Sequence, residues 1–105
     1  MRYIMSVKSR AKPGREDDYD HWYDEVHKAD MLTLSGILSC DRYRELDMQG
    51  KETGECIAQY AVETDDPAAL LQSVFAATPT MRMTEAIDLE SPQFTFLRPH
   101  QGKGA

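Results

Sequence analysis

The chain has 105 residues and a formal net charge of -6 at pH 7, a length that suits one domain. Its lysines and arginines are scattered and form no basic run, so we expect no partner among nucleic acids or anionic membrane surfaces. No apolar stretch approaches the roughly 20 residues that cross a bilayer, and no signal peptide is recognisable, so we expect a cytoplasmic protein.

Hydrophobic patterns divide the first half of the chain into a strand, a helix and a strand. Met1 to Lys8 alternates between apolar and polar residues, which predicts a strand. From Arg15 to about Leu34 the period is helical, with acidic residues in the first turn and Gly36 as the C-cap. Residues 37–46 then predict a second strand.

A hairpin is predicted in the middle of the chain. Residues 56–63 form the third expected strand, and only the polar turn 47–54 separates it from the second, so the two should pair antiparallel. Cys40 and Cys56 fall in these two strands. We expect reduced thiols, as is usual in the cytoplasm, although the hairpin leaves open whether the two residues are close enough for a disulfide.

The last part of the chain predicts a helix and a final strand. Asp66 is a suitable N-cap, and Pro67 is a suitable first residue for a helix that runs to about Ala77. Residues 80–87 are expected as a further short helical turn. Residues 93–98 alternate again and predict the fourth strand.

The order strand, helix, strand, strand, helix, strand indicates an α+β fold of the ferredoxin-like, or split βαβ, type. It has one four-stranded antiparallel sheet with two helices on one face. We expect a single domain over residues 1–98 and a flexible C-terminal tail over 99–105. Because the other face of the sheet needs a cover, a second copy of the chain is the expected partner, which makes a homodimer.

The predicted first helix has an unusual inward face. At about 100° per residue, one arc of the helix collects five side chains. They are Tyr19, Trp22, Tyr23, Val26 and His27. Aromatic rings with an imidazole at their edge are typical of a pocket wall, whereas a plain packing face would use Leu, Ile and Val. His27 is therefore a candidate general acid/base, the alternative being a helix-edge histidine hydrogen-bonded to the sheet.

Two strand tyrosines are candidate partners of His27. Tyr3 or Tyr60 could place a phenol beside the imidazole, which suits enolisation, since His removes a proton while Tyr stabilises the developing oxyanion. The alternative for each is a buried core tyrosine. Trp22 and Tyr23 are expected to bind a planar substrate together with Tyr19, or else to pack in the core.

The second predicted strand adds candidate binding residues. Arg42 and Arg44 lie on one face and Tyr43 on the other, so an arginine could hold a substrate carboxylate, or could form a salt bridge to a helix or to a dimer partner. No metal site is expected, because His21 and His27 fall on different helix faces and no Cys/His cluster has zinc spacing. Phosphate-binding loops and serine-nucleophile motifs are missing from the sequence as well.

The segment from Tyr19 to Arg44 resembles the EthD-like members of the dimeric α+β barrel superfamily. The resemblance rests on Trp-Tyr, a His four residues after the Tyr, a Gly, and a strand ending in Arg-Tyr. Here these elements are Trp22-Tyr23, His27, Gly36 and Arg42-Tyr43. The resemblance implies a dimer whose two sheets meet as a barrel, with a ligand cavity between each sheet and its helices.

Relatives of this kind include polyketide cyclases, lactone isomerases, cofactor-free monooxygenases and haem-handling enzymes. We expect a cofactor-independent enzyme of the cyclase, isomerase, dehydratase or lyase type. Its substrate would be a small apolar carbonyl compound, aromatic or polyketide-like, and His27 would be the acid/base. The alternatives are a monooxygenase, cofactor-free or haem-dependent, and a non-catalytic accessory protein that binds a small molecule.

Overall fold

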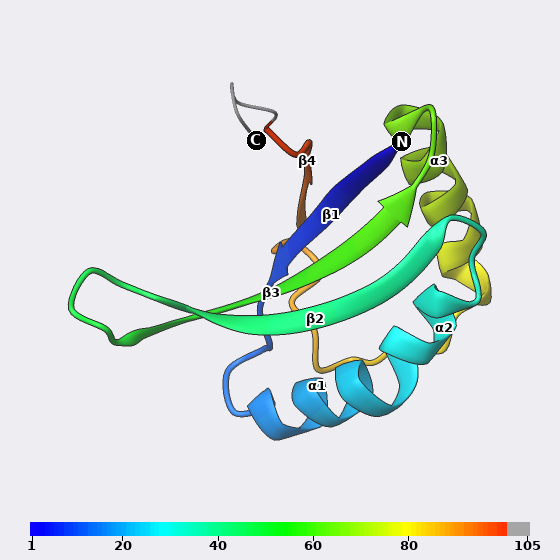
Figure 1. Ribbon diagram of the computed structural model, residues 1–105. Coiled ribbons are helices and arrows are strands. Elements are labelled where there is room, and N and C mark those ends of the chain that lie inside the picture. The colour runs from blue at the N-terminus through cyan, green and yellow to red at the C-terminus, as the bar shows by residue number, and fades with distance from the viewer. Residues whose placement is uncertain (101–105) are drawn as a thin grey trace.

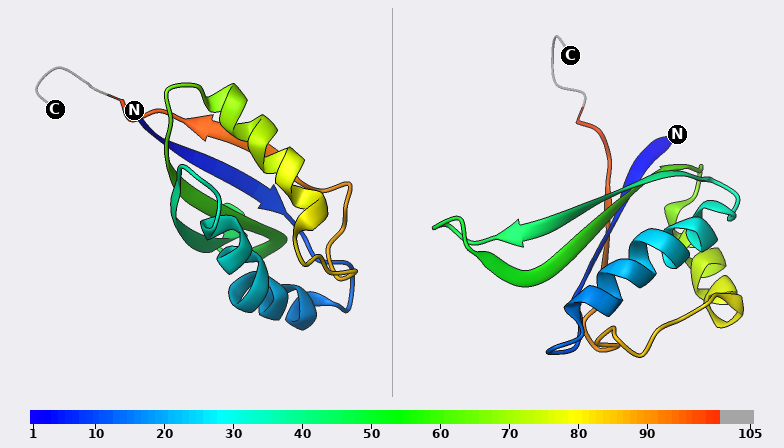
Figure 2. Two further views of the ribbon diagram at one scale, coloured as in Figure 1. Left: turned by 90° about the vertical axis from the view of Figure 1, so that its right-hand side faces the viewer. Right: turned by 90° about the horizontal axis from the view of Figure 1, so that it is seen from below.

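The alternating segments of the sequence pair into one antiparallel sheet, and the helices all lie on one face of it (Figures 1 and 2). The computed structural model describes residues 1–100. The strands are β1 (Arg2–Ser9), β2 (Ile37–Leu46), β3 (Glu52–Glu63) and β4 (Gln93–Leu97), in the spatial order β2-β3-β1-β4. This confirms the predicted ferredoxin-like α+β fold.

The helical segments are α1, a π-helical turn η1, α2, α3 and a 3₁₀ turn η2. Their bounds are Glu16–Trp22, Tyr23–His27, Lys28–Leu32, Pro67–Ala77 and Thr78–Thr80. The start of α3 is as predicted, because the Asp66 carboxylate accepts a hydrogen bond of 3.1 Å from the backbone N–H of Ala69. No helix within residues 1–100 is long and apolar enough to cross a membrane.

The inward face of the sheet is built from directly opposed residues. One row across the four strands contains Cys40, Tyr60, Met5 and Phe96. Met5 and Tyr60 are completely buried. On each strand, the two residues that flank this row along the chain point to the outer face. The row therefore lies at the centre of the core beneath the helices.

The first helical segment differs from its prediction. A continuous helix was expected from Arg15 to Leu34, but the π-helical turn η1 interrupts it and α2 ends at Leu32. A π-helical turn is wider than an α-helical one and brings residues five apart into line. The ring of His27 therefore stacks on that of Trp22, with centroids 4.5 Å apart and planes inclined by 21°.

The turn after this segment requires a glycine. Gly36 has φ +88°, and a Cβ at this position would come within 2.9 Å of the Glu63 carbonyl oxygen. The N–H of Glu63 in turn donates a hydrogen bond of 2.8 Å to the carbonyl oxygen of Gly36. Gly36 is therefore not the predicted C-cap, since α2 ends at Leu32 with Thr33 as its cap, and its glycine is required by this close approach to β3.

The β2–β3 hairpin is longer than predicted. β3 begins at Glu52 rather than at Cys56, and in Figure 1 the far end of the hairpin extends beyond the rest of the sheet. The Asp47 carboxylate shortens the turn by accepting hydrogen bonds from the N–H groups of Gln49 and Lys51. The register settles the open question about the cysteines: Cys40 opposes Tyr60 whereas Cys56 opposes Arg44, and both are free.

The segment from α3 to β4 is not helical where the sequence predicted a turn at 80–87. Instead, Ala11 and Ile87 form an isolated antiparallel bridge. The backbone N–H of Lys12 donates to the carbonyl oxygen of Ala86, at 2.7 Å. Pairing with the chain that leaves β1 replaces the local hydrogen bonds of a helix. We call residues 81–92 the α3–β4 connection.

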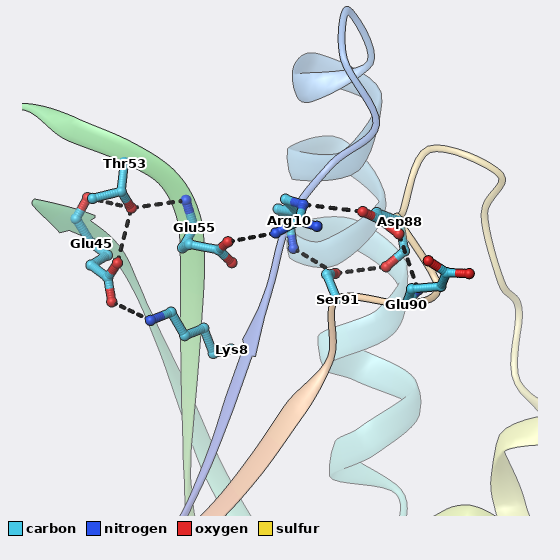
Figure 3. Close-up of polar contacts among 8 residues, drawn as sticks. All are labelled: Lys8, Arg10, Glu45, Thr53, Glu55, Asp88, Glu90 and Ser91. Carbon is cyan, nitrogen blue, oxygen red and sulfur yellow. Dashed lines mark hydrogen bonds and ion pairs between the residues drawn. The ribbon is translucent and has the colours of Figure 1, made fainter.

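Side chains fix the end of this connection to the sheet (Figure 3). The Arg10 guanidinium contacts Asp88 at 3.1 Å and Glu55 on β3 at 2.9 Å. The backbone N–H of Arg10 donates to the Ser91 hydroxyl, at 3.0 Å. These contacts hold the α3–β4 connection across the end of the sheet. Of the tail predicted over residues 99–105, positions 101–105 lie outside the described residues.

Candidate functional site

A cavity of about 220 Å³ lies between the sheet and the helical layer. Its wall comes from β1, β3, β4, the first helical segment, α3 and the α3–β4 connection. The lining residues are Val7, Ser9, Trp22, Tyr23, His27, Met31, Tyr60, Val74, Phe75, Thr78, Met83, Ile87, Leu89, Pro92 and Phe94. Most are apolar, and a few polar groups converge on the space, as in small-molecule sites.

The predicted aromatic face does point inward. Tyr19, Trp22 and Tyr23 are buried and pack against each other, with centroid distances of 5.4 to 6.1 Å. The indole N–H of Trp22 donates a hydrogen bond of 2.7 Å to the carbonyl oxygen of Arg82 in the α3–β4 connection. This bond satisfies the polar edge of Trp22 and fixes the ring on which His27 stacks.

Tyr23 and Tyr60 form a hydrogen-bonded pair in the cavity wall. Their hydroxyl oxygens are 2.7 Å apart, and burial raises the pKa of both phenols. Both hydroxyls therefore stay protonated at neutral pH. The mutual bond of the pair uses one of its two protons. The second can donate to Cys40, which contacts Tyr60, or to a bound molecule.

His27 also lines the cavity, in edge-to-face contact with Tyr23 at 5.0 Å between centroids. Burial lowers its pKa to about 4, against the opposing effect of the Asp30 carboxylate. Desolvation disfavours the charged imidazolium, which is why the pKa lies below its ordinary value of 6.5. His27 is thus neutral at pH 7. Its Nδ1 is buried and has no hydrogen-bond partner among residues 1–100.

The structure does not bring all predicted site residues to the cavity. Tyr3 packs at the edge of the core, and its hydroxyl lies 3.7 Å from the sulfur of Met1. Tyr19 is buried behind the wall and shares a 2.6 Å hydrogen bond with the Ser9 hydroxyl. Tyr43 lies on the outer face of the sheet, and 52% of its surface is exposed.

Arg42 is held by the first helical segment instead of facing the cavity. Its guanidinium donates to Asp24 at 2.8 Å and to Asp20 at 2.9 Å, and it lies 4.7 Å from the ring centroid of Tyr23. Burial alone would lower the Arg42 pKa, but the two carboxylates raise it. Of the two roles considered from the sequence, the salt bridge to a helix is the one observed, and it fixes the ring of Tyr23 from behind.

The mouth of the cavity was missed by sequence reasoning. Phe75, Met83 and Leu89 line it and are exposed over 46%, 45% and 72% of their surface. Met83 and Leu89 belong to the α3–β4 connection, which has no strand or helix period. Their proximity to His27 depends on the backbone bridge between Ala11 and Ile87, and no local sequence pattern signals that bridge.

The volume of the cavity and its lining limit the groups it can enclose. Pockets for drug-sized ligands measure roughly 300–1,000 Å³, so a cavity of about 220 Å³ is too small to enclose a group as large as haem. Within residues 1–100, no three His, Cys, Asp or Glu side chains are grouped so as to hold a metal ion.

The fold is similar to that of a known EthD-type protein. A crystal structure of an ethyl tert-butyl ether d (EthD) family protein from Bacillus halodurans matches with a TM-score of 0.65, covering 93% of this chain and 99% of that one at 14% identity. No protein-family model matches the sequence, and neither does any curated protein. The likeness shows an EthD-like α+β fold, and the chemistry has to be argued from the site.

Proposed function

We propose that the protein is a cofactor-independent enzyme that catalyses proton transfer on a small aromatic or polyketide-like carbonyl compound. One observation carries the proposal. A neutral, unpaired imidazole and a protonated tyrosine pair line the same apolar cavity. The first is a base at neutral pH, and the second is a hydrogen-bond donor to an oxygen atom.

The chemistry would be enolisation. The free proton of the Tyr23–Tyr60 pair donates to the carbonyl oxygen, and His27 takes a proton from the carbon beside it. The C–H electron pair forms a carbon–carbon double bond, and the carbonyl becomes an enolate held by the tyrosines. Because a base with a pKa of about 4 is weak, stabilisation of the oxyanion would supply much of the driving force. Cyclisation, isomerisation, dehydration and lyase reactions all use such an enolate.

Exchange of ketone protons tests this proposal without knowledge of the natural substrate. The methyl-ketone protons of para-methylacetophenone are followed by NMR in heavy water with the wild type and with His27→Ala. We expect the catalysed exchange to fall by roughly 10²- to 10⁴-fold in the variant. His21→Ala is the matched control, because His21 is an exposed histidine of α1 and should leave the rate unchanged. Wild-type exchange in His27→Ala would refute the proposal.

A non-catalytic binding protein is the second candidate. It is favoured by the lack of any carboxylate hydrogen-bonded to His27 among residues 1–100, since catalytic histidines are commonly oriented by such a group. A wild-type protein that binds the ketone but exchanges its protons no faster than buffer would establish this second function over the first.

We also propose that the chain forms a homodimer through the outer face of its sheet. No described helix covers this face (Figure 2). It carries Ile4 and Ile57 between the more exposed Leu38, Tyr43 and Leu97. Pairing two such faces would bury this apolar surface. Light scattering should give the mass of a dimer for the wild type and of a monomer for Ile57→Lys, whereas Gln72→Lys on the exposed side of α3 should remain dimeric.

A further inference from the structure

We propose that the cavity selects uncharged compounds with a single aromatic ring, which enter with their carbonyl or phenol oxygen first, and that it rejects carboxylates of the same shape. The inference rests on the proposed site and names its ligand class. Three features of the cavity lead to it: the lack of a cation in its wall, its volume, and the depth at which its polar atoms lie.

No arginine or lysine of residues 1–100 lines the cavity. Two arginines contact residues of the cavity wall, and the guanidinium groups of both are already paired. Arg42 lies behind Tyr23 with both terminal nitrogens on aspartates, and Arg82 donates to Asp30 at 2.6 Å. An ionised carboxylate in the cavity would therefore be buried without a counter-ion, which costs several kcal/mol per ion. A neutral oxygen pays no such penalty.

The enclosed volume has room for one ring, and a longer ligand would extend out through the mouth at Phe75 and Leu89. A cavity of about 150 Å³ lined by apolar side chains is large enough for benzene. At about 220 Å³, this cavity has room for one ring with short substituents, and it lies below the range of roughly 300–1,000 Å³ typical of drug-sized ligands.

The polar atoms lie deep and the apolar ones lie at the mouth. Tyr60 has no exposed surface and Tyr23 has 3%, whereas Leu89 at the mouth is 72% exposed. The unpaired Nδ1 of His27 is buried as well. A ligand that satisfies these groups must present its oxygen to the interior and leave its apolar end near Phe75 and Leu89.

Three ligands of matched shape test the inference by calorimetry. They are para-methylacetophenone, para-toluate and para-cymene, which carry a carbonyl, a carboxylate and an isopropyl group at the same position. Trp22 is the only tryptophan in the chain and lines the cavity, so its fluorescence reports whether the ligand occupies this site.

We expect the ketone to bind at least about 100-fold more tightly than para-toluate, because several kcal/mol correspond to two or more powers of ten. The ketone should also bind more tightly than para-cymene, and Tyr60→Phe should reduce that second difference. Equal or tighter binding of para-toluate would overturn the inference, as would binding of none of the three or equal binding of ketone and para-cymene.

These outcomes are separate from those of the enolisation proposal. A protein that prefers the ketone but exchanges no protons retains this ligand class and loses the catalytic role. A protein that exchanges the ketone protons but binds para-toluate as tightly as the ketone retains the catalytic role and loses the ligand class. The wild-type comparison requires no variant, so it stands even if Tyr60→Phe fails to fold.

Discussion

The polar groups on the two sides of the first helical segment, residues 16–32, have different surroundings. On one side, Asp20 and Asp24 are paired with Arg42 at hydrogen-bonding distance. On the other side, His27 faces an apolar cavity with a buried nitrogen that has no partner among residues 1–100. Two carboxylates hold Arg42 and so position the helix, although the Arg42 Nε is itself buried without a partner among residues 1–100. His27 is held by no carboxylate in this way, and its imidazole lines the cavity, where a ligand can reach it. The difference separates the structural polar residues of this protein from the proposed functional ones.

Removal of the tyrosine hydroxyl should have the largest effect on the cavity side. Tyr60→Phe deletes one member of the donor pair and should lower ketone proton exchange by roughly 10²- to 10³-fold, the usual cost of one oxyanion donor. NMR exchange rates in heavy water measure it. Tyr43→Phe, which deletes a hydroxyl from the outer face, is the control. Equal rates for the two variants would remove Tyr60 from the proposed mechanism.

The low pKa of His27 predicts a pH-dependent stability. Between its ordinary pKa of 6.5 and its folded pKa of about 4, the unfolded chain binds a proton that the folded chain does not. The free energy of unfolding should therefore decrease as the pH falls through this window, with about 3 kcal/mol due to His27. Urea unfolding at pH 7 and pH 4.5 should show a smaller decrease in His27→Gln, in which the other titrating groups are retained.

A direct titration checks the same point. Trp22, Tyr23 and Asp30 are the groups that surround the imidazole, and only Asp30 carries a charge to oppose the effect of burial. The NMR signals of the His27 ring should titrate near pH 4. A midpoint at the ordinary value of 6.5 would contradict a buried, neutral imidazole.

Disruption of the side of the first helical segment that contacts Arg42 should lower the free energy of unfolding more than it lowers the rate of ketone proton exchange. Arg42→Met removes one of the two arginines on the partly buried Asp20, leaving Arg44, and should lower the free energy of unfolding by about 1 to 2 kcal/mol. Arg15→Met breaks only an exposed pair with Asp18 and should change it by less than about 0.5 kcal/mol. Chemical denaturation measures both. Equal losses of unfolding free energy in the two variants would show that the Arg42 salt bridges stabilise the protein no more than an exposed ion pair does.

The smallest expected effect lies away from both sides. Asp66→Ala removes the N-cap of α3 and should cost about 1 kcal/mol, while Asp66→Asn keeps an acceptor and should cost little. Thermal unfolding of the two variants, with exchange rates unchanged, would show that general destabilisation does not imitate loss of the site. Equal melting temperatures for Asp66→Ala and Asp66→Asn would contradict a capping role for the Asp66 side chain.

The fold was predictable from the sequence because its signals are local. Alternation in residues 1–8 and the Asp66-Pro67 helix start each act within a few residues, and each is found where it was expected. The π-helical turn was not predictable, because at 100° per residue Trp22 and His27 lie about 140° apart, at the two edges of the expected inward arc, and no sequence pattern signals the wider turn that brings them into line. Only the stacking of the two rings distinguishes the wider turn.

The candidate site was predictable in part. Trp22, Tyr23, His27 and Tyr60 line the cavity as their helix and strand periods suggested. Arg42 lies on the inward face of β2, but it forms salt bridges with two aspartates one turn apart on the helix. Sequence spacing alone could not decide between these salt bridges and a role in binding a substrate carboxylate. The mouth depends on long-range backbone pairing of the α3–β4 connection, so no local pattern encodes it.

The most direct test of the central claim, that buried tyrosine protons and a neutral imidazole meet a ligand oxygen in this cavity, is the carbonyl carbon-13 resonance of bound para-methylacetophenone. Donation from the Tyr23–Tyr60 pair should move this resonance downfield from its position in an apolar solvent, and Tyr60→Phe should reverse most of that shift. A bound ketone whose carbonyl resonates as in an apolar solvent, and equally in both proteins, would contradict the account.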